Sequence, residues 1–560
     1  MPQPYLLMPA QGSDCADEWH RLGLEAQVAG QLPLAQQRYQ QALRLDPRHA
    51  LATQNLAIVF AQSNLLNEAL LTIERAAMLD GKFGCINTNW AFIALEADRI
   101  DDALREARSG YEKEQNAASR LALAMVSATA GKPADALPLY NEMLDAEPQH
   151  PAAGPNSCFV QTLTNATPAE LFAQRKKWWS ANHYTGPVET HHNDRSLDRT
   201  LRVGYVGGDF KQHSAAFIFS RVLWHHTPAV EMYLYSSLPV DPVADGKTKR
   251  FQDAAGPRWR DLSAMSDEDA DRLIRKDKID ILVDLAGHTN GGRLALFTRR
   301  PAPVQVTAWG FAHGTGCAEV DYFLADPIAV PADERQHYAE KIVDLPCIVT
   351  MEPPTEYNLK GTSSPPVRSN GCITFGSYAR YEKLSDECLA SFAEIMRRVP
   401  DSRLQFKDGA FRRPYSIRRI LSFMDGIESE RLLFSIATNH PDHLLAYQQA
   451  DICLDPWPHG GGVVGLETLY MGVPLITRYG GQPSGRSAAS VLTAMGRTDW
   501  IAKTPDEYIA KAVEWSDKPQ ELASARKTLR QELLDSPVVK GYVEQVENAY
   551  CEIWRQYANS

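Results

Sequence analysis

The sequence predicts an all-α N-terminal part followed by two α/β domains, each built on a parallel sheet with helices on both faces. Residues 16–150 contain a helical repeat, and short apolar strands alternate with helices in two series after residue 200. The length of 560 residues, at roughly 150 residues per domain, allows three to four domains. The expected segments are a tail (1–15), the repeats (16–150), a linker with one helix (151–200), a first α/β half (201–350), a second linker (351–371) and a second α/β half (372–560).

A repeat of about 34 residues defines the N-terminal part. One alanine recurs at steps of 34, 34 and 33 residues, as Ala35, Ala69, Ala103 and Ala136. Small residues at this spacing let two helices cross closely, and a proline ends the second helix of a pair. One pair cannot bury its apolar face alone, so we expect about four pairs stacked into a superhelix with a concave surface. That surface is either a groove for a peptide or partner, or a structural or dimerising arm.

Apolar segments of β type define the two halves that follow. They are LRVGYV (201–206), MYLYSSL (232–238), IDILVDLAG (279–287), VQVTAWG (304–310) and DYFLADPIAV (321–330), then CITFGSY (372–378), RLLFS (431–435), DICLD (451–455) and VPLITR (473–478). Nearly continuous apolar strands between helices indicate buried parallel sheets. Two doubly wound domains joined by a hinge place a ligand cleft at the carboxyl ends of both sheets.

Composition argues against several classes of protein. The chain carries 58 Lys and Arg against 69 Asp and Glu, a net charge of -11, which does not fit a protein that coats nucleic acid or an anionic membrane. Its nine cysteines are scattered and never form CxxC, so neither a disulfide framework nor a zinc site is expected. We see no signal peptide and no apolar run of roughly 18 residues. We therefore expect a cytoplasmic protein without nucleic-acid or membrane partners.

The stretch DICLDPWPHGGGVVGLETL (451–469) carries the most chemical information. A buried strand ends at Asp455, and the glycine-rich loop 460–462 leads into a helix that contains Glu467. Glycines permit close backbone approach, and free N–H groups at a helix start favour phosphate. A carboxylate about one turn inside the helix can accept hydrogen bonds from ribose hydroxyls. Together these features predict a nucleotide site.

Four motifs, in this order, resemble those of the O-GlcNAc transferase family in its bacterial, tetratricopeptide-containing form. They are RVGYVGGDFKQHSAAF (202–217), DILVDLAGHTNGGRLALFTRRPAPVQVTAWGF (280–311), YEKLS (381–385) and ADICLDPWPHGGGVVGLETL (450–469). The resemblance covers residues 16–550 and implies tetratricopeptide repeats before a GT-B fold of two Rossmann-like halves. It also implies transfer of GlcNAc from UDP-GlcNAc to Ser or Thr of a protein acceptor held by the repeats, with no cofactor. Bacterial N-glucosyltransferases share the catalytic halves but not the repeat array.

The resemblance assigns donor-binding roles to several residues. Lys383 matches a lysine that contacts the donor diphosphate, and a point charge there suits a departing phosphate. Glu467 stands where the family has a ribose-binding aspartate, and His443 matches a histidine near the uridine. Arg380 replaces a glutamine that is common near the phosphates in animal relatives. The phosphate loop comprises Gly461, Gly462, Val463 and Val464; animal members have His-Thr-Thr at 462–464, so here only the backbone cradle is expected to remain.

The resemblance also places residues beside the sugar. His213 matches a histidine that is a candidate catalytic base, which suits deprotonation of an attacking hydroxyl, but a donor-binding or structural role stays open. The WGF turn around Gly310 approaches the donor sugar. His288 and His313 follow predicted strands and face the cleft, either as ligand contacts or as loop histidines.

Catalysis is expected to be inverting and independent of metal. The acidic run SDEDAD (266–271) opens a predicted helix, where acidic residues serve as cap and dipole partners, so we do not interpret it as a metal motif. Two other functions stay open: a UDP-glucose-dependent transferase acting on Asn, and a repeat scaffold with an inert nucleotide-binding half. The sequence does not decide whether copies of the chain form a homo-oligomer.

Overall fold

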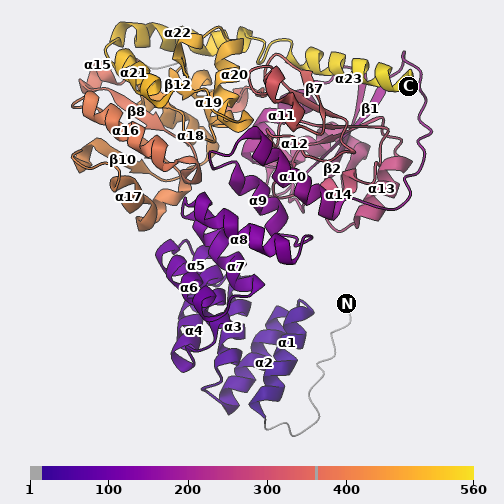
Figure 1. Ribbon diagram of the computed structural model, residues 1–560, viewed down its shortest axis with the longest axis vertical. Helices are drawn as coiled ribbons and strands as arrows, with labels where there is room; N and C mark the ends of the chain where they lie inside the picture. The colour runs from indigo at the N-terminus through magenta and orange to yellow at the C-terminus, as the bar shows by residue number, and fades with distance from the viewer. Residues whose placement is uncertain (1–14, 358, 360–363) are drawn as a thin grey trace. The chain divides into compact units, whose positions relative to one another are not determined.

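The computed structural model describes residues 15–357, 359 and 364–560 (Figure 1). The chain forms two compact units. The first ends at Ala146 and includes Arg412–Ser416, and the second comprises Glu147–Phe411 and Ile417–Ser560. The first unit holds the predicted repeats, and the second holds both α/β halves together with the helical linker.

Within residues 15–146 the first unit consists of eight helices that pack as four consecutive pairs. They are α1 (Ala16–Val28), α2 (Leu32–Leu45), α3 (Ala50–Gln62), α4 (Leu66–Leu79), α5 (Gly84–Glu96), α6 (Ile100–Lys113), α7 (Ala117–Thr129) and α8 (Pro133–Ala146). The repeat alanines Ala35, Ala69, Ala103 and Ala136 lie on the second helix of each pair and are fully buried. The repeat prediction is therefore confirmed.

Two linker helices belong to the second unit. They are α9 (Ala153–Gln161) and α10 (Pro168–Asn182), and only α10 is predicted from the sequence. Thr167 and Glu170 form a capping box that starts α10. The indole of Trp179 donates to Glu319 Oε2 at 2.7 Å, which ties α10 to the first α/β half.

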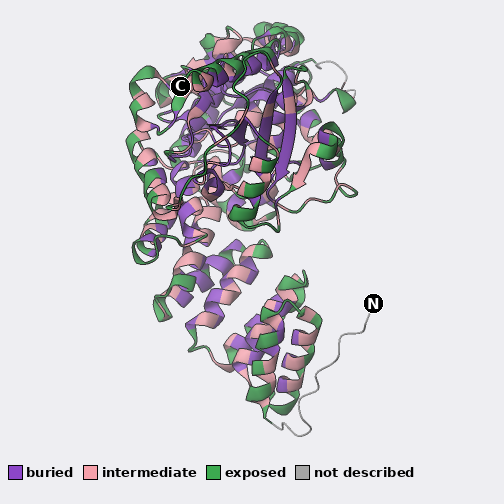
Figure 2. Cartoon of the chain, turned by 90° about the vertical axis from the view of Figure 1, so that its right-hand side faces the viewer, coloured by how far each residue is buried: buried purple, intermediate pink, exposed green. Residues whose placement is uncertain are grey.

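The first half is a seven-stranded parallel sheet in the order β3-β2-β1-β4-β5-β6-β7. Its strands are β1 (Leu201–Gly207), β2 (Val230–Ser236), β3 (Trp259–Asp261), β4 (Ile281–Asp284), β5 (Val304–Thr307), β6 (Tyr322–Ala325) and β7 (Lys341–Asp344). Its helices are α11 (Ser214–Trp224), α12 (Gly246–Ala255), α13 (Asp267–Lys276) and α14 (Leu294–Phe297). Strands β1, β2, β4 and β5 are almost wholly buried, and the sheet is the purple core in Figure 2.

The second half is a six-stranded parallel sheet in the order β10-β9-β8-β11-β12-β13. Its strands are β8 (Thr374–Ser377), β9 (Arg403–Lys407), β10 (Leu432–Ser435), β11 (Ile452–Leu454), β12 (Leu475–Arg478) and β13 (Ile501–Ala502). The helices of this region are α15 (Val367–Asn370), α16 (Asp386–Arg398), α17 (Pro414–Leu421), α18 (His440–Ala446), α19 (Gly462–Tyr470), α20 (Ser487–Ala494), α21 (Pro505–Ser516), α22 (Pro519–Asp535) and α23 (Tyr542–Ala558). Both sheets have the doubly wound order in which ligands bind beyond the carboxyl ends of the strands, as the sequence predicts.

The structure differs from the sequence prediction in two respects. Strands β3, β7, β9 and β13 are additional, because they are short or carry polar residues that an apolar pattern does not select. Helix α23 ends the chain but packs on the first half, although the sequence places it with the second. The Tyr550 hydroxyl lies 3.2 Å from that of Tyr205 on β1, and Glu547 contacts His226 at 2.9 Å. The last helix thus joins the two halves.

Candidate active site

A cavity of about 860 Å³ lies in the second unit, where loops from the carboxyl ends of both sheets converge. The segments that line it follow β1, β4 and β5 in the first half and β8, β11 and β12 in the second, and residues of α9 and just before it add a further wall. Ten of the predicted site residues line this one cavity: His213, His288, Gly310, His313, Arg380, Lys383, Gly461, Gly462, Val463 and Val464. The structure therefore brings together residues that are up to about 250 positions apart in the sequence.

The glycine-rich loop that lines the cavity is fixed by a hydrogen bond to Asp455, at the end of β11. Its carboxylate accepts hydrogen bonds from the Gly461 N–H at 2.8 Å and from the Thr477 hydroxyl at 2.7 Å. Burial raises the pKa of this carboxyl to about 6, although both hydrogen bonds oppose the shift. Helix α19 starts directly after Gly461, so its free N–H groups face the cavity. The arrangement is suited to phosphate.

Lys383 supplies a cation beside this loop. Its Nζ donates to the carbonyl oxygen of Gly460 at 2.8 Å. Desolvation and the neighbouring charge of Arg380 lower the pKa of the ammonium to about 7. The guanidinium of Arg380 lies 5.7 Å above the ring of Phe159 on α9. Two basic side chains and a helix N-terminus thus line the same cavity, which is an electrostatic environment that favours an anionic group.

His213 lies on the opposite side, in the first half. It caps α11, where its Nδ1 accepts from the Ala215 N–H at 3.3 Å and lies 3.2 Å from the Asp209 carboxylate. About half of its side chain is exposed. Because one nitrogen cannot accept and donate at once, protonation of Nδ1 would exchange the cap for a bond to Asp209. In that tautomer Nε2 has a free lone pair.

The WGF turn after β5 forms another wall. Trp309 has a left-handed backbone with φ of 57°, and its indole N–H donates to the Tyr542 hydroxyl of α23 at 3.0 Å. Gly310 follows, and a Cβ there would lie 1.6 Å from the carbonyl oxygen of Leu285. Only glycine fits at this position, and its backbone is exposed to the cavity.

His288 and His313 are both buried and line the same cavity. The Nε2 of His288 donates to the Thr315 carbonyl oxygen at 2.7 Å. No described residue bonds to either ring nitrogen of His313. Burial, reinforced by the charge of Arg175, lowers the pKa of both imidazoles.

Glu467 and His443 lie apart from the lining of this cavity. The Glu467 carboxylate is nearly buried and contacts His440 Nε2 at 2.8 Å, the Tyr447 hydroxyl at 3.0 Å and His443 Nε2 at 3.3 Å. Burial raises its pKa, but hydrogen bonds from both histidines outweigh this effect, and the pKa falls to about 2. The structure therefore groups the two predicted nucleoside residues, and their roles remain predictions.

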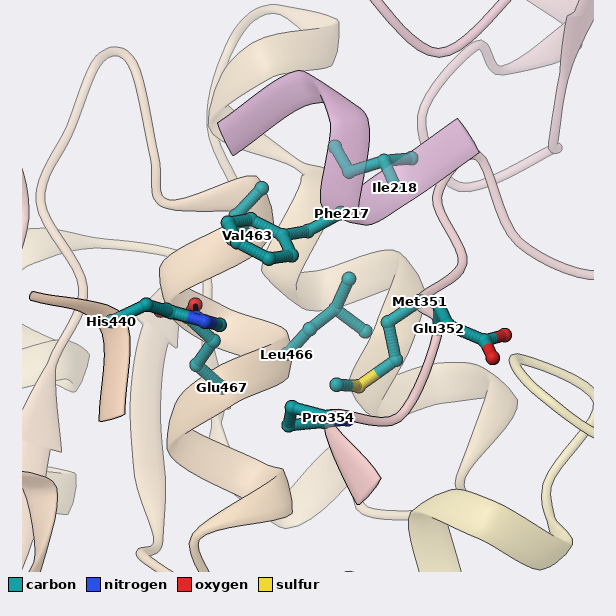
Figure 3. Close-up of a pocket in the computed structure, with 9 residues that line it drawn as sticks. All are labelled: Phe217, Ile218, Met351, Glu352, Pro354, His440, Val463, Leu466 and Glu467. Atoms are coloured by element: carbon teal, nitrogen blue, oxygen red, sulfur yellow. Dashed lines mark hydrogen bonds and ion pairs between the residues drawn. The ribbon is translucent and has the colours of Figure 1, made fainter. Parts of the chain in front are cut away.

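A small apolar recess adjoins this cluster (Figure 3). Phe217 of α11 and Met351 and Pro354 of the second linker face Leu466 and Val463 of α19 across it. The rings of Phe217 and His440 stack at 4.1 Å with planes inclined by 26°. The recess is the point at which the two halves touch beside the carboxylate.

The part of the chain that the structure describes contains no cluster of three or more His, Cys, Asp or Glu side chains that could hold a metal ion. The acidic run before and within α13 is used locally: Ser266 caps the helix, and Asp267 pairs with Arg293 at 2.6 Å. In the same described part, no helix is long and apolar enough to cross a membrane.

Comparison with known proteins identifies the family. Glycosyl transferase family 41 matches residues 164–351 and 364–546, and a tetratricopeptide-repeat family matches residues 20–81 and 89–151. The chain belongs to glycosyl transferase family 41.

Several known proteins are similar to this chain over about two thirds of its length or more. A protein of Arabidopsis thaliana named probable UDP-N-acetylglucosamine–peptide N-acetylglucosaminyltransferase SPINDLY is 34% identical over 425 residues, covering 73% of this chain and 46% of the relative. The Hordeum vulgare protein of the same name is 36% identical over 379 residues, covering 66% and 39%. The chain thus spans less than half the length of these relatives. A solved structure of a mutant Thermobaculum terrenum O-GlcNAc transferase matches with a TM-score of 0.78, 25% identity and 99% coverage of both chains.

Four residues of this family 41 site were not selected from the sequence. His440 lies on α18 with His443, and Tyr447 directly follows that helix; their spacings of three and four residues from His443 are a signal that could have found them. Asp455 stands at the end of a predicted strand, the usual place for a residue that holds a ligand loop. His459 is partly buried and lines the large cavity, and its Nδ1 lies 3.0 Å from the Thr162 hydroxyl of the linker. That contact depends on tertiary structure, and no local sequence pattern predicts it.

Proposed function

We propose that this family 41 chain transfers GlcNAc from UDP-GlcNAc to Ser or Thr hydroxyls of proteins. The observation that carries the proposal is one cavity in which Lys383 and the start of α19 face His213 across the two halves. The printed names of the SPINDLY relatives and of the Thermobaculum terrenum enzyme support the donor and the acceptor class. The repeat unit is the proposed holder of an extended protein acceptor.

The proposed reaction is a single displacement with inversion. The acceptor oxygen forms a bond to the anomeric carbon while the bond from that carbon to the β-phosphate oxygen breaks, and UDP leaves with the electron pair. His213, oriented by Asp209, takes the acceptor proton, a transfer worth roughly 10²- to 10⁴-fold in such reactions. Lys383 and the backbone N–H groups after Gly461 stabilise the negative charge that develops on UDP. With this cationic environment in place, the proposal requires no metal ion.

The decisive experiment is calorimetric titration of UDP into the wild type and Lys383→Ala, in buffer containing a chelator. Wild type is expected to bind, and the substitution is expected to weaken binding by roughly 1.5–3 kcal/mol, the scale of a charge-assisted contact. Lys249→Ala is the matched control, because Lys249 is exposed and pairs with Asp253 one turn along α12. GDP is titrated in parallel to test the choice of base.

Each outcome has a defined meaning. Binding of UDP that depends on Lys383 supports the donor site and leads to a transfer assay with UDP-GlcNAc and UDP-glucose on peptides containing Ser, Thr or Asn. Transfer of glucose to Asn would replace the proposed reaction with N-glucosylation. Tighter binding of GDP than of UDP would overturn the uridine donor. Absence of nucleotide binding would leave the repeat scaffold as the better account.

A further inference from the structure

His313 is an unusual histidine for a protein interior. It follows β5 by a few residues, its relative exposure is 1%, and it lines the large cavity. Among the residues that the structure describes, none bonds to its Nδ1 or its Nε2. A buried polar group without a partner costs roughly 1–3 kcal/mol, so such groups are rare unless a ligand completes them.

Two other buried histidines of the same unit show what a structural role looks like here. His226 is bonded at both nitrogens, with Nε2 2.7 Å from the Tyr205 hydroxyl and Nδ1 2.9 Å from Glu547. His288 is bonded at one, by its 2.7 Å contact with the Thr315 carbonyl oxygen. His313 lacks even one such contact. An apolar residue of similar volume would therefore stabilise the fold as well as the His313 side chain does.

The loop around His313 is nevertheless tightly fixed. The N–H of Thr315 donates to the buried Glu340 carboxylate at 2.5 Å. Gly314 and Gly316 have φ of 71° and 75°, and a Cβ at Gly316 would meet Arg175 of α10 at 2.7 Å. The Phe311 ring lies 5.3 Å from the imidazole. The imidazole is thus presented from a rigid loop, as a preorganised binding group must be.

The chemistry of the ring indicates what it recognises. Burial, with the charges of Arg175 and Arg486 nearby, lowers the pKa of His313 well below its usual value, so the ring is neutral near pH 7. A neutral imidazole offers one N–H donor and one lone pair, whereas a phosphate oxygen only accepts. A hydroxyl group, which both donates and accepts, is the matching partner. A neutral ring with a low pKa is also a poor general base, which leaves that role with His213.

The position of the His313 ring then indicates which part of a bound nucleotide sugar it contacts. Lys383 and the glycine-rich loop occupy the side of the cavity formed by the second half, and the Gly310 turn and His313 occupy the side formed by the first. A sugar attached to a diphosphate at Lys383 extends away from the phosphate loop, towards this turn. We infer that His313 hydrogen-bonds a hydroxyl of the donor hexose and so discriminates among nucleotide sugars. The inference rests on the proposed function, whose donor it makes more specific.

The test compares binding of UDP with use of UDP-GlcNAc in His313→Leu. Because His313 belongs to the first half and the phosphate loop with Lys383 to the second, the Kd of UDP is expected to stay within about threefold of wild type. The kcat/KM for UDP-GlcNAc is expected to fall roughly 10- to 100-fold, the size of one lost hydrogen bond in a site that is built for it. Thermal stability is expected to hold or rise, because an unpartnered polar group is removed. The exposed His192→Ala is the control.

Two polar variants sharpen the result and cover a failure of the leucine variant to fold. Asn places its amide near the position of Nδ1, and Gln places its amide near Nε2, so partial recovery by one of them identifies the nitrogen that binds. A panel of UDP-GlcNAc, its C4 epimer and UDP-glucose is expected to show a smaller spread of kcat/KM in His313→Leu than in wild type.

The outcomes separate this inference from the proposed function. If the wild type binds no UDP, the proposed function fails and this inference falls with it. If UDP binds normally but His313→Leu, or Asn and Gln in its place, leaves kcat/KM and the donor ranking unchanged, the inference alone is overturned. A large loss of thermal stability in all three variants, with normal donor ranking, would show that His313 is structural.

Discussion

The ammonium nitrogen of Lys383 lies 2.8 Å from the carbonyl oxygen of Gly460, the first glycine of the loop before α19. Burial, together with the neighbouring charge of Arg380, lowers the pKa of the Lys383 ammonium to about 7, although the carboxylates of Asp455 and Glu382 oppose the shift. A group held at that pKa is sensitive to the charge of whatever binds next to it.

Binding of UDP is therefore expected to take up a proton above pH 7. A diphosphate favours the ammonium and raises its pKa, so affinity is highest below pH 7 and declines, by at most tenfold per unit, as the pH rises above it. The second ionisation of a phosphate, near pH 6, is complete in this window. Titration at pH 8 in two buffers of different ionisation enthalpy measures the uptake. Equal enthalpies in both buffers, or the same pH dependence in Lys383→Ala, would contradict the assignment.

Gly310→Ala is expected to destabilise the second unit by roughly 3 kcal/mol or more. The added Cβ would lie 1.6 Å from the Leu285 carbonyl oxygen, so the backbone of the turn or of the β4 loop must move. Urea unfolding at pH 7 measures the effect. Gly246→Ala, at an exposed site with nothing within 4 Å, is the control and should change stability by less than about 1 kcal/mol. Similar stabilities for the two variants would refute the steric argument.

Glu467→Gln is expected to lower the free energy of unfolding at pH 7 by on the order of 3 kcal/mol. The folded-state pKa of about 2 lies below the ordinary 4.5, so this carboxylate contributes stability above pH 4.5 and loses it as the pH falls towards 2. The difference between variant and wild type should therefore shrink over that window. Urea unfolding between pH 7 and pH 3 follows it, with the exposed Glu430→Gln as the control. A difference that is independent of pH would mean that packing, not charge, is lost.

The sequence predicted those parts of the fold that local patterns determine. The repeat alanines and strands such as β1, β4 and β5 were found because small residues recur at one period or because a short segment is wholly apolar. Strand β9 was not found, because it buries the polar side chains of Gln405 and Lys407. Gln405 donates a hydrogen bond to Gln449 at 2.9 Å, and Lys407 donates one to Thr438 at 2.7 Å. Such a strand looks polar until its distant partners are known.

The same limit applies to the candidate site. Motif resemblance located ten of the residues that line the cavity, because they lie in recognisable stretches that follow strands. Resemblance did not predict the hydrogen bond between His440 and Glu467, or the one that Asp455 accepts from Gly461 in the glycine-rich loop. It also could not show that His313 is buried without a partner. These properties depend on how separate segments pack against one another.

Tyr542 at the start of α23 provides a test of how the last helix supports the cavity wall. Its hydroxyl accepts from the Trp309 indole at 3.0 Å and donates to the Cys347 carbonyl oxygen at 2.9 Å, so Tyr542→Phe leaves a buried donor and a buried acceptor without partners. The expected cost is about 1–3 kcal/mol in urea unfolding. Because Trp309 precedes Gly310, the kcat/KM for the sugar donor should fall while the Kd of UDP holds. Tyr557→Phe on the same helix is the control, since the Tyr557 hydroxyl bonds to none of the described residues. If the two variants have the same stability and the same kcat/KM, α23 covers the sheet without supporting the turn.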